Sequence, residues 1–155
     1  MVLSILTGRV SKTGDNFEHM NTIMTHHLVR SEDLNHHNTL YAGRAADWFI
    51  EVGYMAVEQY LPSSNVVCAK IEETTFFKSI YSGETVRIES EVVYAAGSRL
   101  VSYIATYVGE EKRAEGYITF AYVGEYGHSK AHGIAIEAET EGEIAQQERA
   151  KKMLC

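Results

Sequence analysis

Polar side chains crowd into the segment Asn35 to Gly43, which leads directly into a long predicted helix. The first amide groups of a helix have no partner within it, and the helix dipole adds partial positive charge there. A carbonyl group placed at those amides would be polarised, and each donor to a developing oxyanion contributes about 3 kcal/mol. Ala42 and Gly43 are small enough for a ligand to reach the backbone. The segment therefore predicts a site that grips a carbonyl group.

One long helix, from Leu40 to Leu61, must position this segment. Its apolar and small residues recur at the helical period of three and four, and Pro62 follows where the helix would stop. The predicted stripe consists of Ala42, Ala45, Phe49, Val52, Gly53, Ala56 and Tyr60. Because the stripe is rich in small residues, another element can approach this helix closely.

Five segments are predicted to be strands, because they are rich in β-branched and aromatic residues and turn signals separate the last four. They are Thr22 to Val29, Val66 to Phe77, Glu84 to Ala95, Arg99 to Val108 and Arg113 to Glu125. Short turns between consecutive strands imply antiparallel pairing. The pattern predicts an α+β fold in which a curved antiparallel sheet wraps one long central helix.

The length of 155 residues is typical of a single domain. We expect one domain over residues 1–155, with a core over about 22–125, a lead-in over 1–20 and a polar tail over 127–155. Within that tail, Glu143 to Leu154 could form a short helix.

The net charge of −7 opposes binding to nucleic acid or to an anionic membrane. No apolar stretch approaches the roughly 18 residues that a membrane span requires. The two cysteines, Cys68 and Cys155, are isolated and make neither a disulfide framework nor a metal site. These features predict a cytoplasmic protein. His26 and His27 are neighbours on a predicted strand and must point to opposite faces, so we expect no metal site.

Three stretches resemble a known family. The run from Arg30 to Arg44, followed by Trp48 and Glu51, resembles the signature of hotdog-fold acyl-CoA thioesterases of the 4-hydroxybenzoyl-CoA thioesterase-like superfamily. That signature reads Arg-Pro-x-Asp-x-Asn-x-x-Gly-Thr-x-Phe/Tyr-Gly-Gly, followed by a helix with Trp-Met-Asp-Glu. The run from Phe76 to Glu84 is similar to the family's Phe-x-x-Pro-x-x-x-Gly-Asp, and the turn at residues 97–99 to its Gly-x-Ser turn. The resemblance covers residues 22–125.

The resemblance implies a hotdog fold and the hydrolysis of an acyl-CoA thioester to a free acid and CoA. By position, Asn35 would hold the attacking water or the substrate carbonyl, and the Ala42 amide would polarise that carbonyl. Gly43 matches the second glycine of the family motif. No cofactor is implied, since coenzyme A is part of the substrate. A homodimer or a higher homo-oligomer, such as a tetramer or hexamer, is implied, with the site between subunits; an exposed sheet edge would favour such pairing.

The family's catalytic carboxylate lies seven residues after the second glycine, where this chain has Ile50. Isoleucine can neither accept a proton nor attack a thioester. Glu51 matches the motif's glutamate but lies about 100° around the helix, so it is either the replacement base, a solvated residue or a subunit contact. Glu73 is the other candidate base, because apolar neighbours on its strand face, Ile71 among them, would raise its pKa.

Several further residues have two interpretations. His36 and His37 could act as bases or be loop residues, and Asn38 and Thr39 could cap the helix. Thr39 and Tyr41 are candidates for substrate contact. The basic residues Lys78, Arg99 and Arg44 are either phosphate partners of coenzyme A or surface charges.

Three functions stay open at this point. The first is an acyl-CoA thioesterase. The second is a non-catalytic acyl-CoA or acyl-carrier-protein binding protein that has lost the base at Ile50. The third is hydration or dehydration of an acyl thioester, which would need a histidine at the helix entrance.

Overall fold

The computed structural model describes residues 9–10 and 16–154. Its long helix, α1, spans Ala42–Glu58, and a second helix, α2, spans Glu141–Met153. Short 3-10 turns occupy Ser31–Asp33 and Ser63–Asn65. The strands are β1 (Arg9–Val10), β2 (Asn16–His19), β3 (Ile23–Leu28), β4 (Val66–Phe76), β5 (Thr85–Ala96), β6 (Arg99–Val108), β7 (Glu111–Tyr122) and β8 (Ile134–Glu137).

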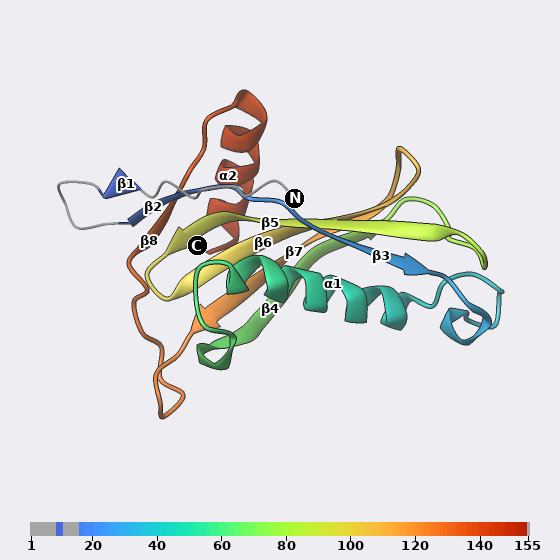
Figure 1. Ribbon diagram of the computed structural model, residues 1–155, viewed down its shortest axis with the longest axis horizontal. Helices are drawn as coiled ribbons and strands as arrows, with labels where there is room; N and C mark the ends of the chain where they lie inside the picture. Colours follow the sequence, from blue (N-terminus) through green and yellow to red (C-terminus); the bar gives the residue numbers. More distant parts are fainter. Residues whose placement is uncertain (1–8, 11–15, 155) are drawn as a thin grey trace, which may run out of the picture.

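The main sheet has five strands in the order β3-β5-β6-β7-β4, and every neighbouring pair is antiparallel. Figure 1 shows α1 lying along one face of this sheet, which curves over it. The predicted α+β architecture of an antiparallel sheet around one central helix is confirmed. The predicted strand Arg99 to Val108 matches β6 at both ends, and the other strands differ by up to three residues at either end.

The apolar stripe of α1 packs against the inner face of the sheet. Its buried residues are Ala45, Trp48, Phe49, Val52, Gly53, Ala56 and Val57. A methyl group at Gly53 would lie 3.4 Å from Ile104 and Phe120, so the glycine permits the close approach that the small-residue stripe predicted. Ser102 on β6 donates a 3.0 Å hydrogen bond to the Gly53 carbonyl and ties the helix to the sheet.

The edge strand β4 is irregular. Its register against β7 shifts between Cys68 and Lys70 and again between Glu72 and Thr75. Each extra residue breaks the alternation of faces. The prediction that Glu73 lies among apolar neighbours is therefore wrong: Glu73 is exposed and has a φ of 49° at the second irregularity.

The segments outside the predicted core join each other. β2 pairs in parallel with β8, and β1 pairs with β2. Helix α2, predicted over Glu143 to Leu154, begins two residues earlier and packs on the outer face of the sheet, where Ala150 is fully buried. Residues 1–8 and 11–15 of the predicted lead-in, and Cys155, lie outside the described residues. Among the described helices, none is both long and apolar enough to cross a membrane.

Candidate active site

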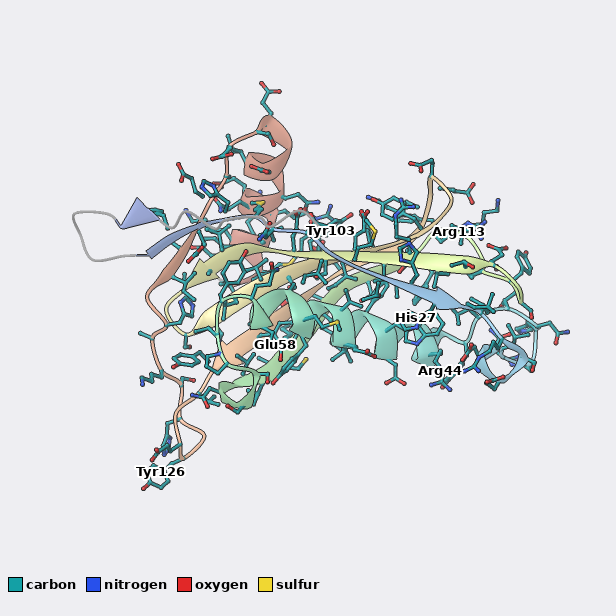
Figure 2. All side chains as sticks on the ribbon, in the orientation of Figure 1. His27, Arg44, Glu58, Tyr103, Arg113 and Tyr126 are labelled. Carbon is teal, nitrogen blue, oxygen red and sulfur yellow. The ribbon has the colours of Figure 1, made fainter. Side chains whose placement is uncertain are left out.

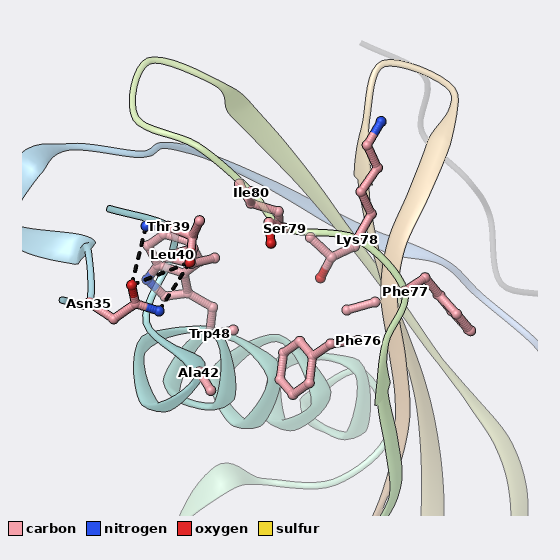
Figure 3. Close-up of a pocket in the computed structure, with 13 residues that line it drawn as sticks. Asn35, Thr39, Leu40, Ala42, Trp48, Phe76, Phe77, Lys78, Ser79 and Ile80 are labelled. Atoms are coloured by element: carbon pink, nitrogen blue, oxygen red, sulfur yellow. Dashed lines mark hydrogen bonds between the residues drawn. The ribbon is translucent and has the colours of Figure 1, made fainter. Parts of the chain in front are cut away.

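A cavity of about 300 Å³ opens between the start of α1, the segment after β4, and strands β6 and β7. Its walls are mostly apolar, with a few polar groups, as in most small-molecule sites. The lining residues are Asn35, Thr39, Leu40, Ala42, Ala45, Trp48, Phe76, Phe77, Lys78, Ser79, Ile80, Thr106 and Ala114. Figure 3 shows the helix start on one side and the segment 76–80 on the other.

Asn35 organises the loop that precedes the helix. Its Oδ1 accepts hydrogen bonds from the His37 amide at 2.8 Å and the Thr39 amide at 3.2 Å. Its Nδ2 lies 3.0 Å from Thr39 Oγ1 (Figure 3), and its own amide donates to the Thr39 carbonyl at 2.8 Å. Asn38 has a φ of 61°, a left-handed conformation that asparagine tolerates better than most residues. The loop before α1 is therefore held by hydrogen bonds between its own residues.

These bonds decide which part of Asn35 can meet a ligand. Oδ1 is committed to two backbone amides, whereas Nδ2 carries two hydrogens and donates only one of them within the described loop. The side chain therefore presents a spare donor. Such a donor can bond a carbonyl oxygen or the oxygen of a water molecule.

The start of α1 supplies further donors. Tyr41 is the N-cap residue, and the amides of Arg44 and Ala45 donate to its carbonyl. Within the described residues, the amides of Ala42 and Gly43 have no acceptor. The expectation that a side chain caps the helix is wrong, because Thr39 is bonded to Asn35 instead.

Not every predicted residue of the motif reaches the cavity. Ala42 lines it, but Tyr41 and Gly43 line a neighbouring hollow together with Asp33 and Arg44. Arg44 pairs with the buried Asp33 carboxylate at 3.2 Å, so its guanidinium is held on that side of the helix. The structure thus separates the motif into two neighbouring surfaces.

The opposite wall of the cavity depends on Arg113, which sequence reasoning did not single out. Its guanidinium donates to the Ser79 carbonyl at 2.6 Å and forms an ion pair with Glu84 at 3.1 Å. Its carbonyl accepts the Phe77 amide at 2.8 Å. The register between β6 and β7 shifts here, which leaves Arg113 out of the ladder and free to hold this wall.

Arg113 is only 8% exposed (Figure 2 shows its position near the end of the sheet). No local sequence signal marked Arg113, because Glu111, Lys112 and Glu115 are charged residues of the same strand. A backbone hydrogen bond connects the two sides of the cavity, since the Leu40 amide donates to the Ile80 carbonyl at 2.7 Å. The two walls are therefore joined directly.

Lys78 and Arg99, the basic residues predicted as possible phosphate partners of coenzyme A, lie at different places. Lys78 lines the cavity at its rim, where its ammonium pairs with Glu111 at 3.3 Å and is largely exposed. The hydrogen bond from Lys78 holds the pKa of Glu111 below its usual value. Arg99 begins β6, at the end of the strand opposite Thr106, and does not line the cavity.

Among the described residues that line the cavity, none is a carboxylate or a histidine. Ile50 packs against the main core, and Glu51 is exposed with no hydrogen bond or ion pair to any described residue. Glu73 pairs with Arg149 of α2 at 2.8 Å, outside the cavity. His36 and His37 are exposed and lie against each other, with ring centroids 3.9 Å apart.

His27 was predicted to lie on a strand, but sequence reasoning did not assign it to the site. Its ring stacks on Trp48, with centroids 4.5 Å apart and planes 8° from parallel. Figure 2 shows His27 on the strand that passes over α1. Because Trp48 lines the cavity, this stack fixes part of its wall.

One group of possible metal ligands exists among the described residues, away from the cavity. Atoms of His19, Glu137 and Glu139 lie within 4.8 Å of one another, and His19 Nδ1 is 3.1 Å from a Glu139 oxygen. Both carboxylates are at least partly open to solvent. The direct contact between His19 and Glu139 brings two of the three residues together.

Comparisons with known proteins agree with this architecture. The family model of the thioesterase superfamily matches residues 37–114. No curated protein matches the sequence. An acyl-CoA hydrolase from Staphylococcus aureus, in complex with butyryl coenzyme A, coenzyme A and coenzyme A disulfide, superposes with a TM-score of 0.79 at 20% identity, over 89% of this chain and 85% of that one.

Two other solved structures are similar. A hexameric acyl-CoA thioesterase in its apo form has a TM-score of 0.76 at 22% identity, over 84% of this chain and 86% of that one. An acyl-CoA hydrolase from Bacillus cereus has a TM-score of 0.74 at 20% identity, over 86% of this chain and 84% of that one. These likenesses confirm the predicted hotdog fold.

Proposed function

This chain belongs to the thioesterase superfamily, and on that premise we propose that it hydrolyses an acyl-CoA thioester to the free acid and CoA. The observation that carries the proposal is a pair of spare hydrogen-bond donors at one cavity. The Ala42 amide has no acceptor among the described residues, and Asn35 Nδ2 has one hydrogen to give. Two spare donors at one mostly apolar cavity suit an oxygen that becomes negative during reaction.

The chemistry follows from this arrangement. Water attacks the thioester carbon, and the carbonyl oxygen takes up negative charge that Asn35 and the Ala42 amide stabilise. A base accepts the proton of the attacking water. The carbon–sulfur bond then breaks, the carbonyl re-forms as a carboxylic acid, and the sulfur leaves as a thiolate that takes the proton.

We assign the base to Glu51, brought to the cavity at a contact between two copies of the chain. Glu51 is exposed and unpaired within the described part of the chain, which suits a group that finds its partner in an assembly. The edge strand β4 exposes apolar side chains: Val67 is 46%, Ile71 49% and Phe76 50% exposed. An edge strand of this kind favours pairing with a second strand. One structural relative is a hexameric acyl-CoA thioesterase, and we propose a homo-oligomer here.

The test measures thiol release from a panel of acyl-CoA thioesters by the wild-type protein, Glu51→Gln and Glu58→Gln. Glu58 is a matched control, since it is an exposed glutamate on the same helix. Loss of a general base lowers kcat by about 10²- to 10⁴-fold, so we expect that loss in Glu51→Gln and full activity in Glu58→Gln. Tight binding of acyl-CoA without thiol release would refute hydrolysis. Full activity of Glu51→Gln would refute only the assignment of the base.

The proposal extends to the setting of the protein. Cys68 is an exposed free thiol, and such a thiol persists best in a reducing compartment. We therefore propose that the enzyme acts in the cytoplasm, with water as its only co-substrate and no cofactor.

A further inference from the structure

Trp48 is the bulkiest residue that lines the cavity. Ala42, Ala45 and Trp48 line it at a spacing of three residues, so they form one stripe of α1 that is about 9 Å long. Two members of this stripe are small, and the third carries an indole. Figure 3 shows Trp48 on one side of the cavity and Phe76 on the other. The space beside the two alanines is therefore limited by the position of Trp48.

His27 holds Trp48 in that position. His27 lies opposite Val86 in the pairing of β3 with β5, and Val86 is a core residue, so both side chains face α1. The His27 ring is stacked on the indole with the two planes 8° from parallel. Since His27 does not itself line the cavity, it contacts the indole from outside the cavity. The stacked ring occupies space into which the indole would otherwise turn.

The cavity offers no partner to a charged acyl group. Lys78 is the only titratable side chain among the described residues that line it, and its ammonium pairs with Glu111 at 3.3 Å at the rim. A charge that moves from water to an apolar wall without a partner is strongly disfavoured. The acyl group that suits this cavity is therefore uncharged.

The volume of the cavity limits the length of that acyl group. A cavity of about 150 Å³ is enough for benzene, and this one is about 300 Å³. By this comparison it accepts roughly a dozen non-hydrogen atoms at most. The thioester carbonyl, bound by Asn35 and the Ala42 amide, takes up part of the space. A straight acyl chain of about eight carbons fits, and a much longer chain does not fit completely.

We propose that the substrate carries an uncharged acyl group of up to about eight carbons, that Trp48 sets this limit, and that His27 is the positioning residue for Trp48. This inference rests on the proposed function, because it concerns the acyl group in the same cavity. Burial of each further methylene group raises kcat/KM by about fourfold until the chain reaches the indole. A longer chain must bend or leave carbon atoms in water, so the rise ends there.

The experiment measures kcat/KM for butyryl-, hexanoyl-, octanoyl-, dodecanoyl- and hexadecanoyl-CoA, and for adipoyl-CoA as the charged counterpart of hexanoyl-CoA. The proteins are the wild type, Trp48→Leu, Trp48→Phe, His27→Ala, His27→Phe and Thr25→Ala. Thr25 is a matched control, since it lies on the same face of β3 as His27 but does not line the cavity.

In the wild type we expect kcat/KM to be highest for octanoyl-CoA and at least about tenfold lower for hexadecanoyl-CoA. Adipoyl-CoA should be at least about 100-fold poorer than hexanoyl-CoA. Trp48→Leu enlarges the cavity and should move the optimum to dodecanoyl-CoA. Trp48→Phe is a smaller change in the core and should raise the rate on dodecanoyl-CoA less, which keeps the test decisive if Trp48→Leu does not fold.

The variants of β3 separate positioning from stability. His27→Ala should shift the optimum towards longer chains, because the indole can then turn aside, whereas His27→Phe keeps a stacked ring and should restore the wild-type optimum. Thr25→Ala should keep the wild-type optimum as well. A loss in His27→Ala that is equal for every chain length, or the same shift in Thr25→Ala, would overturn the positioning role.

A wild-type optimum at hexadecanoyl-CoA, or an unchanged profile in both Trp48 variants, would overturn the proposed limit. Equal rates on adipoyl-CoA and hexanoyl-CoA would overturn the preference for an uncharged group. If no thioester is hydrolysed, calorimetric dissociation constants for the same series decide the matter. A binding optimum that moves to longer chains in the Trp48 variants supports the inference while the proposed hydrolysis fails, and equal or absent binding overturns both.

Discussion

Replacing Asn35 with aspartate separates the two tasks that the structure gives this side chain. The loop uses Oδ1 as an acceptor for the amides of His37 and Thr39, and aspartate keeps such an oxygen. The spare donor on Nδ2 is lost, and a negative charge takes its place. Asn35→Asp should therefore fold normally, with a free energy of unfolding within about 1 kcal/mol of the wild type.

The catalytic effect should be much larger. Removal of one donor to the oxyanion costs about 3 kcal/mol, which corresponds to a loss of 10²- to 10³-fold in kcat. Asn35→Ala removes the acceptor as well, so it should lose about 2 kcal/mol of stability in addition to activity, since two or three partly exposed hydrogen bonds disappear.

Thiol release from an acyl-CoA gives kcat, and urea unfolding gives the free energy of unfolding. Both are measured on the wild type, Asn35→Asp and Asn35→Ala. If Asn35→Asp keeps more than a third of wild-type kcat, then Asn35 serves the loop alone and the role as a carbonyl donor is wrong. If Asn35→Asp is as unstable as Asn35→Ala, the hydrogen bonds to Oδ1 do not hold the loop, and the separation of the two tasks fails.

Three further predictions concern the surroundings of the site. Arg113→Met should lower the free energy of unfolding by about 3 kcal/mol in urea titration, because it leaves the Glu84 carboxylate without its cation; a change below about 1 kcal/mol would contradict this. Burial alone would raise the pKa of Glu115, but hydrogen bonds from a tyrosine hydroxyl and a lysine ammonium lower it. A lowered folded-state pKa stabilises the protein above the unfolded value and ceases to do so as the pH falls through the folded value. Glu115→Gln should thus cost about 1–2 kcal/mol at pH 7 and less at pH 3, and an equal cost at both would refute the reasoning. Ile71→Glu on the exposed edge should shift the sedimentation coefficient towards a monomer, whereas Ile144→Glu, at the same 49% exposure on α2, should not.

The sequence was sufficient to predict those parts of the fold in which the regular spacing of apolar residues continues without interruption. The three-and-four spacing of Ala45, Phe49, Val52 and Ala56 predicted the buried face of α1, and all four are buried. Strand β6 was predicted at both ends because turn residues bound it.

Prediction failed where a single extra residue changes the face of a strand. The irregularities in β4 put Glu73 against Arg149, away from the cavity, and no local pattern announces them. The role of Arg113 likewise could not be predicted, because it depends on the register shift after Thr106 and on a hydrogen bond to Ser79, more than thirty residues earlier in the chain.

The candidate site was predicted as a segment but not as a set of contacts. Asn35, Thr39 and Ala42 were predicted from the motif and Lys78 from its charge, and the structure places all four at one cavity. The motif could not indicate that Asn35 Oδ1 accepts hydrogen bonds from amides of the loop, because these bonds depend on the left-handed conformation of Asn38.

The parallel pairing of β2 with β8 has a consequence for how the chain folds. It joins segments from opposite ends of the sequence, and closing so long a loop is entropically slow. The helix α1 and all five strands of the main sheet lie within residues 23–122, so their contacts need not wait for β8 and α2 to dock. The cavity would therefore form before the pairing of β2 with β8.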